Sequence, residues 1–301
     1  MKISIAMATY NGAKYICEQI DSILNQTVHD YELVICDDCS TDDTFEILKR
    51  FQERDERIRA YQNNQNLGFK KNFEKIIGLC SGDYIALSDQ DDIWLPDHLE
   101  LLLNGMTHNI QIVCGRPIFV DQNNRELPKE FDYLKMDSIP SCDEDMVRHI
   151  LLGTSTFQGA SMLIRKDFFD QALPIPEGAN YHDSWFAALA CFTGGLSYVN
   201  KPVMRYRRYS SSVTIKTMRK SAFRTFLGAT LVNHALLDRL VLVNNIQDRV
   251  LSLSREQKCL LNQIEIILKR RKTLLGRLAN VPYYLRHFRA IYTFDGKHLF
   301  N

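Results

Sequence analysis

The chain has 301 residues, of which 45% are hydrophobic and 24% charged, with 14 Gly and 8 Pro. This composition excludes a disordered, collagen-like or small disulfide-stabilised chain, and the length suits one large α/β domain with an appendage, or two domains. The formal net charge of +1 hides an asymmetry: residues 216–301 hold 16 Lys and Arg against 5 Asp and Glu, whereas residues 1–215 hold 21 against 31. We expect an acidic body and a basic C-terminal region that faces either an anionic partner or solvent.

Apolar runs and cysteines bear on where the protein works. No apolar run approaches the ~20 residues of a membrane-spanning helix, and the apolar stretch 3–8 is too short for a secretory signal. The eight cysteines are scattered and are interpreted as reduced. Cys36 and Cys39 form one C-x-x-C, but the second pair of ligands of a zinc site and the helix start of a redox motif are both missing. We therefore expect a cytoplasmic protein.

Short apolar runs alternate with helical patterns over the first hundred residues, which predicts a mostly parallel α/β sheet flanked by helices. We expect strands at 2–8, 31–36, 58–62 and 83–88, and helices at 13–24, 44–52, 69–79 and 96–104. Ligands bind such sheets at the carboxyl ends of the strands. The segments 8–12, 37–40 and 88–92 should therefore form the site.

The pattern is less regular after residue 104. We expect strands at 111–114, 119–121 and 157–164, a polar loop over 123–145, a helix at 181–192, and one or two strands over 196–207 around Pro202. From about residue 220 to residue 277, apolar positions recur at three- and four-residue spacing. This spacing predicts a separate helical C-terminal region.

Acidic residues gather after two of the predicted strands. Carboxylates this close repel one another unless a cation or hydrogen-bond donors hold them. Asp42 and Asp43 follow Ser40-Thr41 and are typical of a helix start. Asp89, Asp91 and Asp92 precede an apolar Ile-Trp-Leu, which is unusual for a solvated loop. Hard oxygen ligands select Mg²⁺ or Mn²⁺, which commonly take substrate phosphates as further ligands. We therefore predict a divalent metal that bridges a diphosphate.

Five short segments carry a resemblance to a known family by their sequence, order and spacing. They are Ala8-Thr9-Tyr10-Asn11, residues 22–27, residues 34–42, Asn66-Leu67-Gly68 and residues 88–96. Over roughly residues 1–210 the chain resembles the family 2 glycosyltransferases of GT-A fold, an α/β fold. The Ser-Asp-Gln-Asp-Asp-x-Trp form is most similar to rhamnosyltransferase-like members that build bacterial surface polysaccharides. Cys39 departs from the family, which usually has Gly there, so we expect a less permissive turn.

The resemblance implies binding roles for several of these residues. Those that would hold the nucleotide sugar are Thr9, Tyr10, Asn11, Asp38, Asn66, Gly68 and Asp89. The Asp38 carboxylate would accept from the imide N–H of uracil or thymine, which favours a UDP- or dTDP-linked donor. Asp91, with Asp92, would bind Mn²⁺ or Mg²⁺ on the diphosphate, where the cation neutralises charge on the departing nucleoside diphosphate.

The resemblance also implies a general base at the start of the helix at 181–192. Family members keep a carboxylate there, and Asp183 supplies it in Tyr181-His182-Asp183-Ser184-Trp185. The base would take the proton of the acceptor hydroxyl on the sugar face opposite the leaving group, which predicts an inverting reaction. The alternative for Asp183 is a simple helix cap. We interpret His182 as an orienting or structural residue.

The remaining segments are divided between acceptor and partner roles. We expect a catalytic domain over 1–215, with a nucleotide-sugar-binding half at 1–104 and an acceptor-side half at 105–215, followed by the basic region 216–301. Small residues at 153–155 and 157–161 suit an acceptor sugar or ordinary turns. Arg205, Arg207 and Arg208 could reach the diphosphate or form a basic strand edge, so we assign them no role.

The basic C-terminal region mixes Lys and Arg with leucines and aromatic residues. This mixture suits an anionic membrane surface, and it suits packing on the catalytic body or on a second copy of the chain equally well. An anionic membrane would place the protein at the inner face of the plasma membrane, near a lipid-linked acceptor. Pro282 interrupts any long amphipathic helix there.

Three other functions compete with transfer of a sugar to a glycan or glycolipid hydroxyl in cell-surface polysaccharide biosynthesis. A nucleotidyltransferase acting on sugar phosphates usually needs a Gly-rich loop and a lysine after the first strand, where 8–12 has one Gly and no Lys. A dinucleotide-binding oxidoreductase needs the G-x-G-x-x-G that is missing there. A nucleic-acid-binding protein would use the basic region but would leave the acidic clusters unexplained, so we expect no nucleic acid partner.

Overall fold

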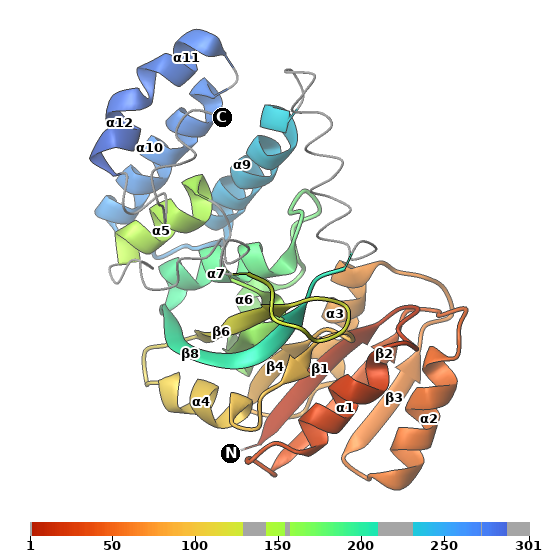
Figure 1. Cartoon of the computed structure of the whole chain (residues 1–301). Coiled ribbons are helices and arrows are strands. Elements are labelled where there is room, and N and C mark those ends of the chain that lie inside the picture. Colours follow the sequence, from red (N-terminus) through yellow and green to blue (C-terminus); the bar gives the residue numbers. More distant parts are fainter. Residues whose placement is uncertain (1, 129–142, 154–156, 210–230, 272, 288–301) are drawn as a thin grey trace. The chain divides into compact units, whose positions relative to one another are not determined.

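The computed structural model describes residues 2–128, 143–153, 157–209, 231–271 and 273–287 (Figure 1). The chain divides into two compact units. The first unit is built from Met1–Leu127, Phe157–Ile175 and Leu196–Arg207, and the second from Pro128–Thr156, Pro176–Gly195 and Arg208–Asn301. Two segments that precede residue 215 thus group with the C-terminal helices.

The first unit contains an eight-stranded sheet in the order β3-β2-β1-β4-β7-β6-β8-β5. The strands are β1 (Ile3–Thr9), β2 (Tyr31–Asp37), β3 (Ile58–Gln62), β4 (Tyr84–Ser88), β5 (Ile93–Trp94), β6 (Ile112–Val120), β7 (Met162–Arg165) and β8 (Leu196–Arg207). β3, β2, β1 and β4 are parallel, whereas β7 runs antiparallel to both β4 and β6. β8 is parallel to β6 and antiparallel to β5. The sheet is therefore parallel in its N-terminal half and mixed beyond it.

Helices connect the parallel strands, as the alternating pattern predicts. They are α1 (Ile16–Leu24), α2 (Thr44–Arg54) and α3 (Phe69–Leu79), and a fourth helix, α4 (His98–Gly105), lies between β5 and β6. A short helix α6 (Phe169–Ala172) and two single 3₁₀ turns, Gly159–Ser161 and Lys166–Phe168, flank β7. The crossovers bring the carboxyl ends of β1, β2 and β4 to one edge of the sheet.

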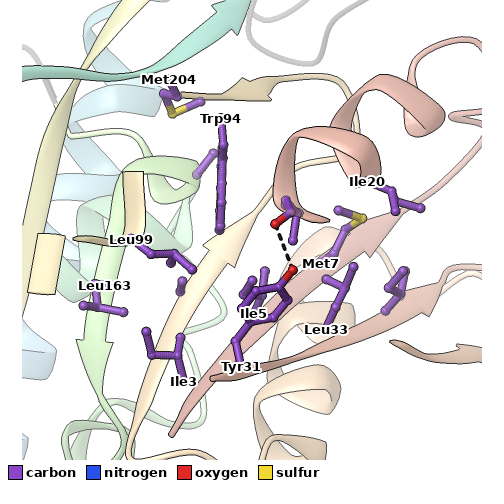
Figure 2. Close-up of a cluster of buried hydrophobic side chains, with 14 of the residues drawn as sticks. Ile3, Ile5, Met7, Ile20, Tyr31, Leu33, Trp94, Leu99, Leu163 and Met204 are labelled. Atoms are coloured by element: carbon purple, nitrogen blue, oxygen red, sulfur yellow. Dashed lines mark hydrogen bonds between the residues drawn. The ribbon is translucent and has the colours of Figure 1, made fainter. Parts of the chain in front are cut away.

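The core of the first unit extends from β1 and β2 to Trp94, Leu163 and Met204 (Figure 2). Ile3, Ile5 and Met7 of β1 are at most 1% exposed, and β2 is buried along its whole length. The Tyr31 hydroxyl donates to the Ile23 carbonyl oxygen at 2.9 Å, so its polar end is satisfied within the core. Burial on both faces is typical of parallel strands and explains their nearly continuous apolar sequence.

The second unit is helical in its described part. Its helices are α5 (Asp143–Leu152), α7 (His182–Thr193), α9 (Leu231–Arg249), α10 (Arg255–Arg270), α11 (Leu274–Ala279) and α12 (Val281–Arg286). α7 packs against α5 and α9, and α10 packs against α9 and α5. Ser254 begins α10 with a capping box that Gln257 completes. No helix among the described residues is long and apolar enough to cross a bilayer.

Several predicted element boundaries are wrong. The predicted strands at 111–114 and 119–121 form one strand, β6, whose pairing with β8 is irregular at Gly115–Pro117. The strand predicted from residue 157 begins only at Met162, after a 3₁₀ turn. The helical pattern predicted up to residue 277 corresponds, within the described residues, to separate helices, of which α9 and α10 are the longest. Residues 129–142, 154–155 and 220–230, for which we predicted loops and helix, lie outside the described residues.

Candidate active site

The loops after β1, β2 and β4 lie next to one another because their strands are neighbours. Thr9 is paired with Asp37 in the register of β1 and β2, and Met7 is paired with Ser88 in that of β1 and β4. The Asp38 backbone N–H also donates to the Thr9 carbonyl oxygen at 2.8 Å. The three predicted strand-end segments therefore meet, as expected from the sequence.

The loop after β1 is bonded to the loop after β2. Asn11 has a positive φ of 49°, and its backbone N–H donates to Ser40 Oγ at 2.8 Å. Its side-chain Oδ1 accepts from the Thr41 backbone N–H at 2.8 Å. Gly12 adds a third bond, from its N–H to Thr44 Oγ1 at 2.8 Å. This loop is therefore rigidly joined to the start of α2.

Gln90 joins the loop after β1 to the acidic loop Asp89–Asp92. Its Oε1 accepts from the Tyr10 N–H at 2.8 Å, and its Nε2 donates to the Tyr10 carbonyl oxygen at 2.9 Å. A Cβ on Gly12 would lie 2.2 Å from Gln90 Oε1, so glycine is the residue that fits there. The Tyr10 side chain is 47% exposed and does not take part in this pair.

Asp37 shapes the turn after β2. It is fully buried and accepts hydrogen bonds from Thr9 Oγ1 at 3.0 Å, from the Ser40 backbone N–H at 2.9 Å and from Gln62 Nε2 at 3.1 Å. Thr9 is itself only 2% exposed, so its hydroxyl is used inside the protein. Cys39 has a φ of +64°, a conformation that favours glycine. The predicted less permissive turn corresponds to this strained position.

Asp38 organises the Asn66–Gly68 loop. Its Oδ1 accepts from Asn63 Nδ2 at 2.7 Å and from the Leu67 N–H at 2.8 Å, and its Oδ2 accepts from the Gly68 N–H at 2.8 Å. The Asp38 carbonyl oxygen accepts from Asn66 Nδ2 at 3.2 Å. The structure thus brings together Asp38, Asn66 and Gly68, three of the residues predicted to bind the nucleotide sugar.

Asp92 differs from its neighbours in the acidic loop. Asp89 and Asp91 are partly exposed, whereas Asp92 is 1% exposed. Burial, and then the charges of Asp91 and Asp89, raise the pKa of Asp92 well above its usual value. Its Oδ1 accepts from the Arg207 backbone N–H at 3.0 Å, but its buried Oδ2 accepts no hydrogen bond from the described part of the chain.

A divalent cation fits these carboxylates when other ligands complete its shell. Among the described residues, no group of three His, Cys, Asp or Glu side chains is placed to hold a metal ion by itself. Mg²⁺-type ions commonly use one or two carboxylates together with water and substrate phosphates. The buried, unsatisfied Asp92 Oδ2 beside two further carboxylates is consistent with such a partial shell.

Asp183 lies in the second unit, in the first turn of α7. Tyr181 is the N-cap, so Asp183 is not the capping residue, although its Oδ1 accepts from the Ser184 backbone N–H at 2.5 Å. Burial lowers the pKa of His182 to about 4, which leaves this histidine neutral near pH 7. That state suits the predicted structural role of His182.

Two residues of α9 hold the region around Asp183. Asp238 Oδ1 accepts from the Asn180 backbone N–H at 2.7 Å, just before α7 begins. Arg239 Nη1 donates to the Ile150 carbonyl oxygen of α5 at 2.5 Å. Burial lowers the pKa of Arg239, while the charges of Asp238 and Asp183 raise it, so these groups lie within electrostatic reach of one another.

Sequence reasoning missed the bonding roles of Gln90 and Arg207. Gln90 lies between Asp89 and Asp91 in the predicted metal-binding segment, and this position was a signal that it could bond to a neighbouring loop. Arg207 gave no signal beyond its charge, because its partners come from segments up to 189 residues away.

The comparisons with known proteins identify the family. The model of glycosyl transferase family 2 matches residues 4–173, more than half of the chain, so the chain belongs to this family. The chondroitin synthase of Escherichia coli is 38% identical over 129 residues, which are 42% of this chain and 18% of that protein. The chain spans less than half the length of several glycosyltransferases that it matches.

Two solved structures share the fold. TarS of S. aureus in complex with UDP has a TM-score of 0.59 at 18% identity, covering 95% of this chain and 79% of that one. The mannosyltransferase PcManGT of Pyrobaculum calidifontis, in complex with GDP-Man and Mn²⁺, has a TM-score of 0.57 at 14% identity, covering 96% and 85%. The predicted GT-A fold with a helical C-terminal region is confirmed. The rhamnosyltransferase-like subgroup stays a prediction.

Proposed function

We propose that this chain transfers a sugar from a nucleotide-diphosphate sugar to a hydroxyl of a glycan or glycolipid in cell-surface polysaccharide biosynthesis, with inversion at the anomeric carbon. The observation that carries the proposal is the bonded set of loops at one edge of the sheet. In it, Asp38 is tied to Thr9, and Gln90 ties Tyr10 to the acidic loop. This arrangement would join a nucleoside site and a diphosphate site within the first unit. The relation to a chondroitin synthase supports a polysaccharide product.

The nucleoside would bind beside Asp38. Asp38 is 2% exposed and its Oδ2 accepts one hydrogen bond, from Gly68; since a carboxylate oxygen can accept two, an imide N–H would supply the second. Thr9, Tyr10, Asn11, Asn66 and Asp89 would shape the pocket for base and ribose. TarS, which shares the fold, binds UDP, and this supports a UDP- or dTDP-linked donor.

A divalent cation would bind at Asp91, with Asp92 as a second carboxylate. When bound, it neutralises negative charge on the departing diphosphate. Asp91 is partly exposed and can face the ligand, whereas Asp92 is buried behind it. PcManGT binds Mn²⁺ with its nucleotide sugar, which supports Mn²⁺ or Mg²⁺ here.

Asp183 would act as the general base on the acceptor hydroxyl. Its place in the first turn of α7, where it is partly exposed and is not the N-cap residue, supports this role. The acceptor-side residues at 157–161 and the sugar itself stay predictions.

A donor screen tests the proposed function. The protein is incubated with Mn²⁺ and UDP-, GDP- and dTDP-linked sugars, including a dTDP-linked deoxysugar, and release of nucleoside diphosphate is measured. We expect release from a pyrimidine donor, and NMR of the product should show inversion. Release of pyrophosphate from a nucleoside triphosphate and a sugar phosphate, with no turnover of any nucleotide sugar, would instead identify a nucleotidyltransferase.

The C-terminal helices would provide the contact with an anionic membrane surface. Four apolar side chains are unusually exposed there: Leu275 (80%), Leu278 (60%), Val281 (45%) and Leu285 (64%). Residues 266–294 contain seven Lys and Arg and no Asp or Glu. Leucines next to cationic side chains suit a lipid interface better than nucleic acid, because the phosphates of nucleic acid attract the cations but do not bind leucines.

Vesicle flotation with phosphatidylglycerol and phosphatidylcholine tests this contact. We expect binding at low salt, weaker binding at high salt, and its loss in Leu278→Ser/Leu285→Ser. Leu251→Ser is the matched control, because Leu251 is 93% exposed outside this surface. Self-association in sedimentation velocity without vesicle binding would favour a second copy of the chain as the partner.

A further inference from the structure

The end of β8 carries a buried arginine whose bonds converge on the acidic loop. The Arg207 side chain is 2% exposed. Its Nε donates to the Asp91 carbonyl oxygen at 2.8 Å, and its backbone N–H donates to Asp92 Oδ1 at 3.0 Å. Its Nη1 donates to the Gln122 carbonyl oxygen at 3.2 Å, and its Nη2 to Glu18 Oε2 at 2.6 Å. One residue therefore binds the backbone of Asp91 and the carboxylate of Asp92 together.

The guanidinium is held so that it can act as a fixed support. Its carbon lies 4.4 Å from the centre of the Tyr15 ring, and Glu18 on α1 supplies the opposite charge. Burying a cation is costly unless its donors are all used, and the planar fork of arginine meets three acceptors that a lysine could not reach at once. Gln90, bonded to Tyr10, fixes the other side of the same loop.

We propose that Arg207 is a positioning residue that sets the place of Asp91 and Asp92, and thereby the affinity of the protein for a divalent cation with a nucleoside diphosphate. The proposal rests on the proposed function. Asp91 is held at its carbonyl oxygen by Arg207, and its neighbour Gln90 is held by Tyr10, so the backbone is fixed on both sides of the Asp91 side chain. Asp92 Oδ1 is bound by the Arg207 backbone, and its Oδ2 is left for another partner.

The strand itself offers a matched control in Arg205. Arg205 donates from Nε to Asn124 Oδ1 at 2.6 Å and from Nη2 to the Asn124 carbonyl oxygen at 3.0 Å. It also pairs with Glu126 at 3.2 Å. Arg205→Lys therefore removes a comparable fork of bonds two residues away without touching the acidic loop.

The test compares Arg207→Lys with Arg205→Lys in the full chain. Free Mn²⁺ is measured by electron paramagnetic resonance during titration in saturating UDP, and amide hydrogen exchange is followed at residues 89–92. We expect Arg207→Lys to weaken Mn²⁺ binding by about 10–100-fold, the usual effect of losing a support behind a metal ligand. Exchange at 89–92 should also rise. Arg205→Lys should change neither quantity.

Thermal melting separates this effect from loss of the fold. If Arg207→Lys does not fold, Glu18→Gln replaces it, because Glu18 is exposed and holds only the far end of the guanidinium. Glu18→Gln should also weaken Mn²⁺ binding, as expected for Arg207→Lys. A folded Arg207→Lys with wild-type Mn²⁺ affinity and wild-type exchange at 89–92 would overturn the proposal. If the wild-type protein binds UDP equally well with and without Mn²⁺, the metal site of the proposed function is contradicted. The hydrogen exchange at residues 89–92 would still decide whether Arg207 positions this loop.

Discussion

The two units hold their candidate site residues by different means. In the first unit, side-chain carboxylates and amides accept or donate across three loops, and many of these bonds join a side chain to a backbone group of a neighbouring loop. In the second unit, Asp183 stands on α7, a helix in which nine of twelve residues are buried. Single polar changes should therefore disturb binding in the first unit, whereas the place of Asp183 depends on how helices pack.

The largest expected effect is that of Asp183→Asn on the rate of transfer. Asparagine keeps the size of the side chain but cannot take up the proton of the acceptor hydroxyl. Loss of general-base catalysis lowers a rate by about 10²–10⁴-fold. Donor affinity, measured calorimetrically, should hardly change, because the base serves the acceptor. Asp248→Asn, an exposed change on α9, is the control, and wild-type turnover of Asp183→Asn would reduce Asp183 to a helix-start residue.

Asp91→Asn tests the first unit in the same manner. The change removes charge but little volume, so the fold should persist while metal-dependent affinity for UDP falls by at least about tenfold. Calorimetric titration with and without Mn²⁺ measures this loss. Asp97→Asn is a suitable control, because Asp97 is exposed and makes no capping bond at the start of α4. Unchanged Mn²⁺ dependence in a folded variant would remove Asp91 from the site.

Acid should destabilise both units through buried histidines. Burial lowers the pKa of His98 to about 3 against the bond from Nδ1 to the Val203 carbonyl oxygen, and it lowers that of His182 to about 4. Both stay neutral in the fold, so their contribution is complete above about pH 6.5 and declines as the pH falls toward these values. For His98 alone, the loss from pH 7 to pH 4 is about 3 kcal/mol. Urea unfolding at both pH values should show a smaller difference in His98→Gln.

Asp238→Ala tests whether packing against α9 places Asp183. It leaves the Asn180 N–H without its acceptor, which costs about 1–3 kcal/mol where that group is removed from water. Transfer should slow while UDP affinity stays constant. Asp248→Ala on the same helix provides the control in urea unfolding and in kinetics. Equal stability and turnover in the two variants would show that α9 does not support the start of α7.

The sequence predicted the first unit better than the second. β1 to β4 lie within one residue of their predicted ends, because strands buried on both faces read as apolar runs bounded by polar turns. The meeting of the site loops could also be predicted, since the carboxyl ends of parallel strands lie at one edge of the sheet. The irregular pairing of β6 at Gly115–Pro117 was hidden, because a local pattern does not record a register shift.

Contacts between distant segments could not be predicted. Arg207 contacts Glu18 and Asp91 only because β8 has joined the sheet, and the spacing of apolar residues near Arg207 does not predict these contacts. The grouping of α5, α7 and α9 has the same origin, because each helix shows only which of its faces is apolar, and not which helix covers it.

The smallest expected effect is that of Cys39→Gly, which separates backbone strain from site chemistry in the first unit. Cys39 has a φ of +64°, and a left-handed conformation costs a residue with a side chain about 1–2 kcal/mol. Glycine avoids that cost but gains about 0.4–1 kcal/mol of freedom in the unfolded chain. The variant should therefore be more stable by roughly 0.8 kcal/mol, the difference between the midpoints of these two ranges. Cys17→Gly is the matched control, because Cys17 is exposed within α1, where glycine is a weaker helix former than cysteine by about 0.3 kcal/mol. Urea unfolding should give the two substitutions opposite signs, and two losses of equal size would show that the turn after β2 carries no strain at residue 39.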